Sequence, residues 1–309
     1  MLKIIHTKNL KWIDIVNPDE KDLNYLKENF RFHPLDFEDI VLPSTRTRID
    51  EYDSHHFILL LLPYLNKHSG EIKPIEVDFF VGKDYLITVH QGQSQTLNNF
   101  FHNIQQFDNA RLQFMSGSPG FLLFSILQVM FKRSSPILDR INHQMQEASK
   151  NIFQSDINTL ETLLQLKKNI ITYRRIVRMH THILNKLVHS NKDYMKFKDS
   201  KTAYEDIIEY AENIWNVLSS DKESVESYEE TNQSLGTHRI NKILHVLTVL
   251  SVIISALVLI TDVMVFFERT HIQESFGLGS EFQLFMFFLT LIFLTTSIIL
   301  VYFRKKKWL

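Results

Sequence analysis

VLTVLSVIISALVLIT (246–261) and FQLFMFFLTLIFLTTSIILVYF (282–303) contain no charged residue. After the first stretch one acid, Asp262, interrupts, and apolar residues continue to Phe267. Each run is about 20 residues or longer, which is enough to cross a bilayer core of roughly 30 Å as a helix. Two buried helices of a soluble protein are disfavoured, because such helices nearly always carry a polar stripe and the second run shows none. We therefore predict transmembrane helices over 242–267 and 282–303.

The charges that flank these runs predict the topology. The tail 304–309 begins with one arginine and three lysines, and basic residues next to a span stay in the cytoplasm. Two spans then place both termini in the cytoplasm, in a multi-pass protein of the cell membrane. The intervening segment 268–281 becomes an external loop, and its acids are Glu268, Glu274 and Glu281.

The overall composition limits the classes of partner. Lys plus Arg is 34 and Asp plus Glu is 35, a balance that argues against a nucleic-acid binder. The absence of cysteine excludes disulfides and thiolate metal sites. No glycine-rich phosphate loop, zinc-protease helix or nucleophile elbow is present, so we expect no enzyme and no prosthetic group.

Residues 1–115 have the pattern of a cytosolic α/β domain. The segments 10–16, 55–65, 75–82 and 84–90 are short and rich in β-forming residues, which predicts strands. Gly82, Lys83 and Asp84 predict a hairpin turn between the last two. Asn17, followed by a proline and two acids, predicts the cap of a helix.

Residues 116–241 have the pattern of long cytosolic helices. No glycine occurs between Gly120 and Gly236, and the last proline is Pro136. Because both residue types break helices, we predict helices over about 119–153, 155–190 and 200–267. The third would be a stalk on the order of 100 Å long that continues into the membrane.

The stalk carries nine acids and one lysine between residues 205 and 230. Such a run is usually a solvated face, and the alternative is a surface that attracts or senses cations. The last three acids of this stretch are Glu226, Glu229 and Glu230.

The first span carries a stripe of residues spaced by three or four, which places them on one helical face. The stripe holds most of the polar groups of the span and consists of Leu244, Thr248, Ser251, Ser255, Val258 and Asp262. A polar stripe in lipid needs water, another helix or an ion path. The hydroxyls could instead bond backbone carbonyls, and Asp262 could sit at the headgroup level.

Four segments resemble the CorA family of magnesium channels. The stretch 31–62 resembles that family's HPL-x-x-ED signature and the R-x-K-x-x-EY segment after it. LKKNIITYRRIVRMHTHILNKL (166–187), HRINKILHVLTVLSVI (238–253) and VYFRKKKWL (301–309) are similar to the family's later helix, the entry to its first span and its basic end. The matching residues in the first stretch are His33, Pro34, Leu35, Glu38, Asp39, Arg46, Arg48, Glu51, Tyr52 and Phe57.

This resemblance implies a homopentamer with five first spans around a central pore. It also implies passive transport of divalent cations, Mg²⁺ first among them. It further implies regulation by divalent ions bound between subunits, and the acids near the family's regulatory site are Glu226, Glu229 and Glu230. The family's Gly-Met-Asn filter motif is missing, and Thr261, Asp262 and Val263 stand where it is expected. We therefore expect a ring of Asp262 carboxylates to replace the filter.

Two other functions remain open from the sequence. Proton-coupled Zn²⁺ transport, as in the related ZntB branch, would use a titratable carboxylate in the pore. A non-conducting scaffold or regulatory membrane protein would explain the missing filter motif. The polar stripe with its carboxylate favours conduction.

Overall fold

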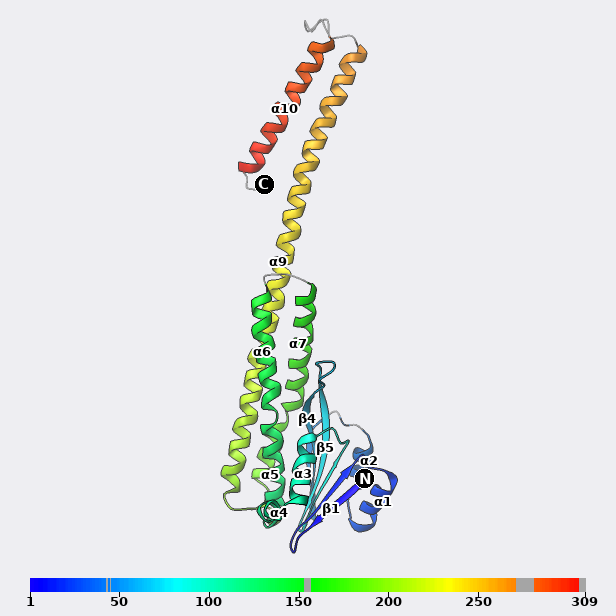
Figure 1. Cartoon of the computed structure of the whole chain (residues 1–309), viewed down its shortest axis with the longest axis vertical. Coiled ribbons are helices and arrows are strands. Elements are labelled where there is room, and N and C mark those ends of the chain that lie inside the picture. The colour runs from blue at the N-terminus through cyan, green and yellow to red at the C-terminus, as the bar shows by residue number, and fades with distance from the viewer. Residues whose placement is uncertain (43, 45, 153–156, 271–280, 306–309) are drawn as a thin grey trace. The chain divides into compact units, whose positions relative to one another are not determined.

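The computed structural model describes residues 1–309 apart from 43, 45, 153–156, 271–280 and 306–309 (Figure 1). The chain divides into two compact units, Met1–Glu229 and Glu230–Leu309. One helix, α9 (Ser200–Thr270), contributes to both units.

The first unit is built on a six-stranded sheet with the order β1-β2-β6-β5-β4-β3. The long central hairpin is made by β4 (His55–Leu65) and β5 (Ile72–Gly82). The pairing of β2 with β6 is parallel and the other pairings are antiparallel. The remaining strands are β1 (Leu2–His6), β2 (Lys11–Val16), β3 (Arg48–Glu51) and β6 (Tyr85–His90).

Helices cover both faces of this sheet, because alternate side chains of each strand point to opposite sides. Ile58 and Leu60 of β4 join a core formed with α3 (Gln95–Gln106), α5 (Pro119–Lys132) and α8 (His180–Val188). Phe57 and Leu59 join a second core on the other face. The helices of that core are α1 (Glu20–Asn29), α2 (Pro34–Val41), α6 (Ser135–Asn151), α7 (Ile157–Val177) and the first part of α9.

Two of the three predicted long helices are interrupted. The first is divided at Arg133 and Ser134 into α5 and α6, because Pro136 in the first turn of α6 cannot continue the preceding hydrogen-bond ladder. The second is divided between α7 and α8 at residues 178–179. Two short elements, α4 (Asp108–Met115) and a 3₁₀ turn at Asp193–Met195, complete the unit.

The first predicted helix cap was wrong by two residues. Asp19, not Asn17, caps α1, and its carboxylate accepts from the backbone N–H of Asp22 at 2.8 Å. Asn17 instead takes a positive φ of 50°. Asparagine tolerates this conformation better than most residues, so it suits the turn that precedes the helix.

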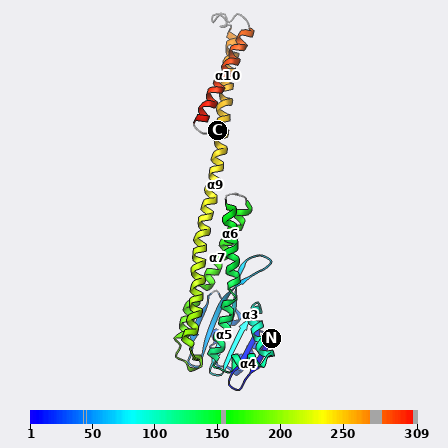
Figure 2. The same ribbon diagram turned by 60° about the vertical axis from the view of Figure 1, so that its left-hand side comes forward.

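The second unit consists of the later part of α9 and of α10 (Glu281–Lys305), which lie side by side in Figures 1 and 2. Among the described residues, three helices are long and apolar enough to span a membrane: Pro119–Asn151, Ser200–Phe266 and Phe285–Lys305. The apolar window of Pro119–Asn151 is 50% buried within the protein, against 11% and 6% for the other two. The predicted fold class, an α/β domain followed by a very long helix and C-terminal apolar helices, is confirmed.

Candidate ion path and acidic sites

The six residues of the predicted stripe all lie exposed on α9. Leu244 and Val258, the two apolar members, are 53% and 52% exposed. At about 100° per residue, the six side chains fall within about 80° of arc on one side of the helix. The structure thus presents one continuous strip of surface in which four of six side chains are polar.

The packing of α10 explains why this strip is open. Ile260 of α9 and Phe288 of α10 form the centre of a small core, to which Met264, Leu291 and Ile292 add. Ile260 and Met264 project about 160–200° away from the direction of Asp262 on the helical wheel. The second apolar helix therefore covers the face of α9 opposite the stripe.

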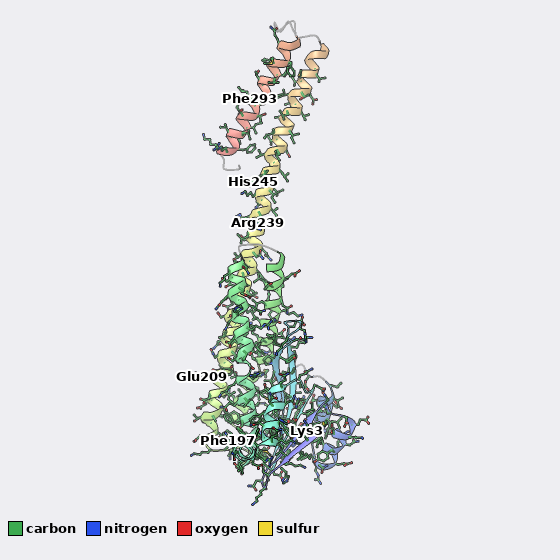
Figure 3. All side chains as sticks on the ribbon, viewed as in Figure 1. Lys3, Phe197, Glu209, Arg239, His245 and Phe293 are labelled. Carbon is green, nitrogen blue, oxygen red and sulfur yellow. The ribbon has the colours of Figure 1, made fainter. Side chains whose placement is uncertain are left out.

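The second apolar helix, α10, exposes large apolar side chains. Phe293, labelled in Figure 3, is 75% exposed on α10, and Leu294 and Val301 are 59% and 66% exposed. A helix that exposes large apolar side chains beyond its contact with α9 is suited to lipid.

One hydroxyl of the stripe makes the local bond that the sequence left open as an alternative. The hydroxyl of Thr248 donates to the carbonyl oxygen of Leu244 at 2.8 Å. The hydroxyl of Thr261, which lies off the stripe, does the same with Leu257 at 2.9 Å. A hydroxyl oxygen that donates in this way still has lone pairs to offer to a hydrated cation.

The acids of the predicted external loop are only partly within the described structure. Glu268 falls in the last turn of α9 and Glu281 is the first residue of α10, and their side chains lie outside the described residues. Glu274 lies outside them entirely.

The three candidate regulatory acids are in different surroundings. Glu229 accepts from the ammonium of Lys167 on α7 at 2.5 Å, and its other oxygen is buried without a hydrogen-bond partner. Glu226 pairs with Lys222 one turn away at 2.7 Å, and this hydrogen bond lowers the pKa of the carboxyl. Glu230 is exposed. Within the described part of one chain, no group of three or more His, Asp or Glu is arranged to hold a metal ion.

The stretch 31–62, which resembles the family signature, forms a network of hydrogen bonds and ion pairs that the sequence predicted only in part. Asp36, at a variable position of the resembling motif, is fully buried and accepts a 2.9 Å hydrogen bond from the hydroxyl of Tyr52. Burial and this hydrogen bond raise the pKa of Tyr52 above its usual range. Arg48 forms ion pairs with Asp39 and, at 2.9 Å, with Asp50. The contacts of Asp36 with Tyr52 and of Asp39 with Arg48 join α2 to β3 and to the residue that follows it.

A buried acid in the sheet was also missed. Asp78 lies inward on β5, 3% exposed, and one of its oxygens has no hydrogen-bond partner among the described residues. Burial raises its pKa well above 3.8, and the neighbouring Glu76 and Asp39 add to the shift. An acid between apolar residues of a strand gives no sequence signal that separates it from a surface residue.

The sequence matches the family described as CorA-like Mg²⁺ transporter protein over residues 7–305. A putative metal ion transporter of Bacillus subtilis, YfjQ, is 22% identical over 254 residues, or 82% of this chain and 76% of its own. The cobalt/magnesium transport protein CorA of Thermotoga maritima is 20% identical over 312 residues, covering 96% of this chain and 83% of its own.

Solved structures give the same fold. The complete CorA magnesium transporter of Methanocaldococcus jannaschii matches with a TM-score of 0.79 and 19% identity, covering 99% of this chain and 94% of its own. The cytoplasmic domain of ZntB from Vibrio parahaemolyticus matches with a TM-score of 0.61 and 14% identity, covering 76% and 90%. The match over nearly the whole sequence, together with the long helix and the apolar pair, shows that this chain belongs to the CorA-like Mg²⁺ transporter family.

Proposed function

We propose that the protein is a passive channel for divalent cations, Mg²⁺ first among them, in the cytoplasmic membrane. The observation that carries this proposal is the open polar strip of α9 on the side opposite α10. Two spans of one chain cannot enclose a pore, so the strip needs other copies of itself to face. In a homopentamer, five strips would meet at one axis and α10 would face lipid.

The proposed topology rests on the basic end of the chain and on membrane electrostatics. Arg304 and Lys305 end α10, and further lysines follow in the sequence. Because such residues stay on the cytoplasmic side, both termini and the whole α/β unit are placed inside.

Asp262 is the proposed replacement for the missing filter. Five carboxylates around one axis repel one another, which raises their affinity for a divalent counter-ion. Rings of acids select cations in pores, and Mg²⁺ gives up its water reluctantly and prefers oxygen ligands. Carboxylate and hydroxyl rings can hold the ion through its hydration shell.

The acids of the stalk are the proposed regulatory site. Glu226, Glu229 and Glu230 do not form a metal site within one chain, so the binding of a divalent ion would need a second subunit. The ammonium of Lys167 already holds Glu229 and would compete with that ion.

The missing filter motif favours one other candidate, a non-conducting member of the family that acts as a scaffold. The fold shared with ZntB leaves proton-coupled Zn²⁺ transport as a further variant. Flux into liposomes containing the purified protein separates the three, when Mg²⁺, Co²⁺, Ni²⁺ and Zn²⁺ are tested with and without a pH gradient.

The matched variants are Asp262→Asn and Thr261→Val, one on the stripe and one beside it at nearly the same depth. Loss of a charged ligand is worth about 1.5–3 kcal/mol, so we expect Asp262→Asn to lower divalent flux about tenfold or more. Thr261→Val should conduct like the parent, and both variants should assemble. Equal flux and selectivity in Asp262→Asn would remove Asp262 from the filter, and no flux of any ion in the parent would favour the scaffold.

A further inference from the structure

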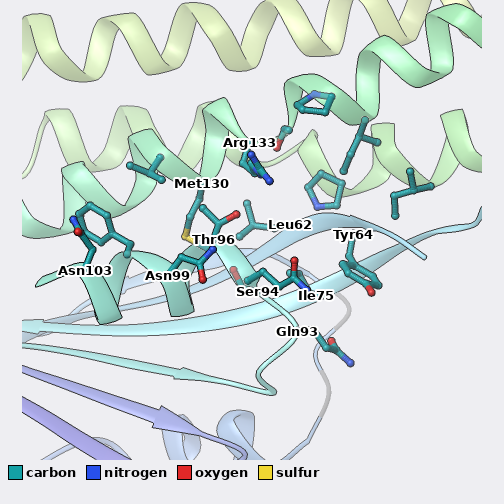
Figure 4. A pocket seen from close by; sticks show the side chains of 18 residues that line it. Leu62, Tyr64, Ile75, Gln93, Ser94, Thr96, Asn99, Asn103, Met130 and Arg133 are labelled. Carbon is teal, nitrogen blue, oxygen red and sulfur yellow. The ribbon is translucent and has the colours of Figure 1, made fainter. Parts of the chain in front are cut away.

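A cavity of about 580 Å³ opens in the α/β unit (Figure 4), and none of the residues that line it belongs to the stripe of α9. It lies between the ends of β4 and β5, the start of α3 and the junction of α5 with α6. Cavities of 300–1,000 Å³ are typical of small-molecule sites. Neither the sequence motifs nor transport explain its lining.

The charge of the lining is of one sign. Arg133 lines the cavity, and none of the 18 lining residues is Asp or Glu. The ion pairs of the described residues give Arg133 no carboxylate partner. An unpaired guanidinium at a cavity is suited to a planar or tetrahedral oxyanion, which it can bind through two parallel hydrogen bonds.

One helix start and one hydroxyl add to this positive end. Gln95 and Thr96, in the first turn of the twelve-residue helix α3, line the cavity, and so does Ser134 at the cap of α6. The first N–H groups of a helix attract anions. Ser134 is only 6% exposed, and its hydroxyl makes no bond to the first turn of its helix. A buried hydroxyl without that bond is available to a ligand.

The rest of the lining is suited to a group that is flat and carries polar edges. Phe100 and Met130 are 9% and 5% exposed, and they present an apolar surface to the cavity. The exposed amides of Gln93, Asn99 and Asn103 surround it. Amide side chains both donate and accept, as the edge of a nucleobase requires.

We propose that this cavity binds a small phosphate-bearing ligand of the mononucleotide class. The phosphate lies at Arg133, Ser134 and the start of α3, and the ring lies on Phe100 and Met130. Because the site shares no residue with the stripe of α9, this proposal does not depend on whether the protein conducts.

The test is calorimetric titration of the detergent-solubilised full chain with AMP, adenosine, ribose 5-phosphate and inorganic phosphate. All titrations are run in EDTA, so that removal of a bound divalent cation cannot imitate binding. We expect AMP to bind most tightly, with ribose 5-phosphate and adenosine each weaker by about tenfold or more, because each lacks one of the two recognised parts.

Arg133→Gln separates anion recognition from a local structural role. Arg133 is exposed and ends α5, where a cation also stabilises the helix dipole. Lys132→Gln is the matched control, since it removes a charge from the same helix end and Lys132 does not line the cavity. We expect Arg133→Gln to weaken AMP at least tenfold and adenosine hardly at all, while Lys132→Gln changes neither. No heat with AMP at millimolar concentration, or equal loss in both variants, would overturn the proposal.

Discussion

Asp78 shows at the scale of a single residue how a buried acid makes the stability of the α/β unit depend on pH. Its folded-state pKa lies above 3.8 because burial disfavours the charged form. The folded protein therefore holds the proton more tightly than the unfolded chain. That contribution to stability is complete below about pH 4 and is lost as the pH rises toward the folded-state pKa.

We expect Asp78→Asn to remove this loss of stability at higher pH. The thermal midpoint of the variant minus that of the parent should increase with pH from about 4 upward, by on the order of 2–4 °C per pH unit. Scanning calorimetry at several pH values measures it. Asp84→Asn, at an exposed position beside the same hairpin, is the control and should give a flat difference. A flat difference for Asp78→Asn as well would mean that its carboxyl titrates at its ordinary value.

The sequence alone predicted where some of the residues discussed above lie, and not where others lie. The stripe of α9 was predictable, because spacing by three and four residues in an apolar segment is enough to fix a helical face. Asp36 and Asp78 were not, because their burial depends on which segments pack over them. The cap at Asp19 was missed for a local reason, since Asn17 and Asp19 are both good caps and the reciprocal bond with Asp22 decides between them.

At the scale of elements, α7 and α9 are joined by the pair of Lys167 and Glu229. The side chain of Glu229 is 16% exposed, so loss of its cation leaves a largely desolvated charge. We expect Lys167→Met to lower the free energy of unfolding by about 1–2 kcal/mol, measured by chemical denaturation. Lys222→Met breaks the more exposed pair with Glu226 and should lower the free energy of unfolding much less.

Lys167→Met also tests whether the proposed regulatory acids bind Mg²⁺. If Mg²⁺ binds Glu229 in the assembled protein, it must displace Lys167, so removal of the lysine should enlarge the rise in thermal midpoint that Mg²⁺ produces. An equal rise in the thermal midpoint of the parent and of Lys167→Met would mean that Mg²⁺ binds elsewhere. Absence of any rise in either would argue against a stabilising site.

Two glycines differ in the space around them, which leads to opposite expectations for the same substitution. A Cβ at Gly120 in α5 would collide with the backbone of Met195, whereas nothing lies within 4 Å of a Cβ at Gly236 in α9. We expect Gly120→Ala to destabilise the protein by about 1–3 kcal/mol and Gly236→Ala to stabilise it by about 0.5–1 kcal/mol. Thermal unfolding measures both, and a destabilised Gly236→Ala would reveal a contact that another subunit makes.

Helix interruptions mark the limit of prediction at this scale. Pro136 was visible in the sequence, and the break before α6 follows from its missing N–H. The break between α7 and α8 has no proline or glycine at Arg178 or Met179, so composition predicted a continuous helix. There the Nε2–H of His180 donates to the backbone oxygen of Leu61 at 2.7 Å, a contact with β4 that only the fold supplies.

At the scale of the whole molecule, the apolar stretches and the glycine-poor middle of the chain were enough to predict the class of fold. The order of the strands was not predictable, because the parallel pairing of β2 with β6 joins segments about 70 residues apart that no local pattern connects. The number of subunits is likewise not predictable from one chain, because it depends on how surfaces of different chains meet.

The absence of cysteine allows a direct test of that assembly. Ser255→Cys places a single thiol on the strip, and Ala256→Cys places one on the half-buried side toward α10. In a central pore, the thiol at 255 should react with a charged methanethiosulfonate and block flux, while that at 256 should react little. Reaction at 256 but not at 255 would contradict the proposed arrangement, because the side of α9 toward α10 would then face the pore.

Oxidation of Ser255→Cys then reports the number of chains. Each sulfur bonds only one other, so a closed ring with an odd number of subunits always leaves one chain unpaired. Complete oxidation of a pentamer should leave roughly one fifth of the chains as monomer on a denaturing gel, with the rest as covalent dimer. A dimer or tetramer would leave none, and a trimer would leave roughly one third. The residual monomer fraction, measured at dilutions that prevent contact between oligomers, therefore tests the pentamer without any assumption about the ion that it carries.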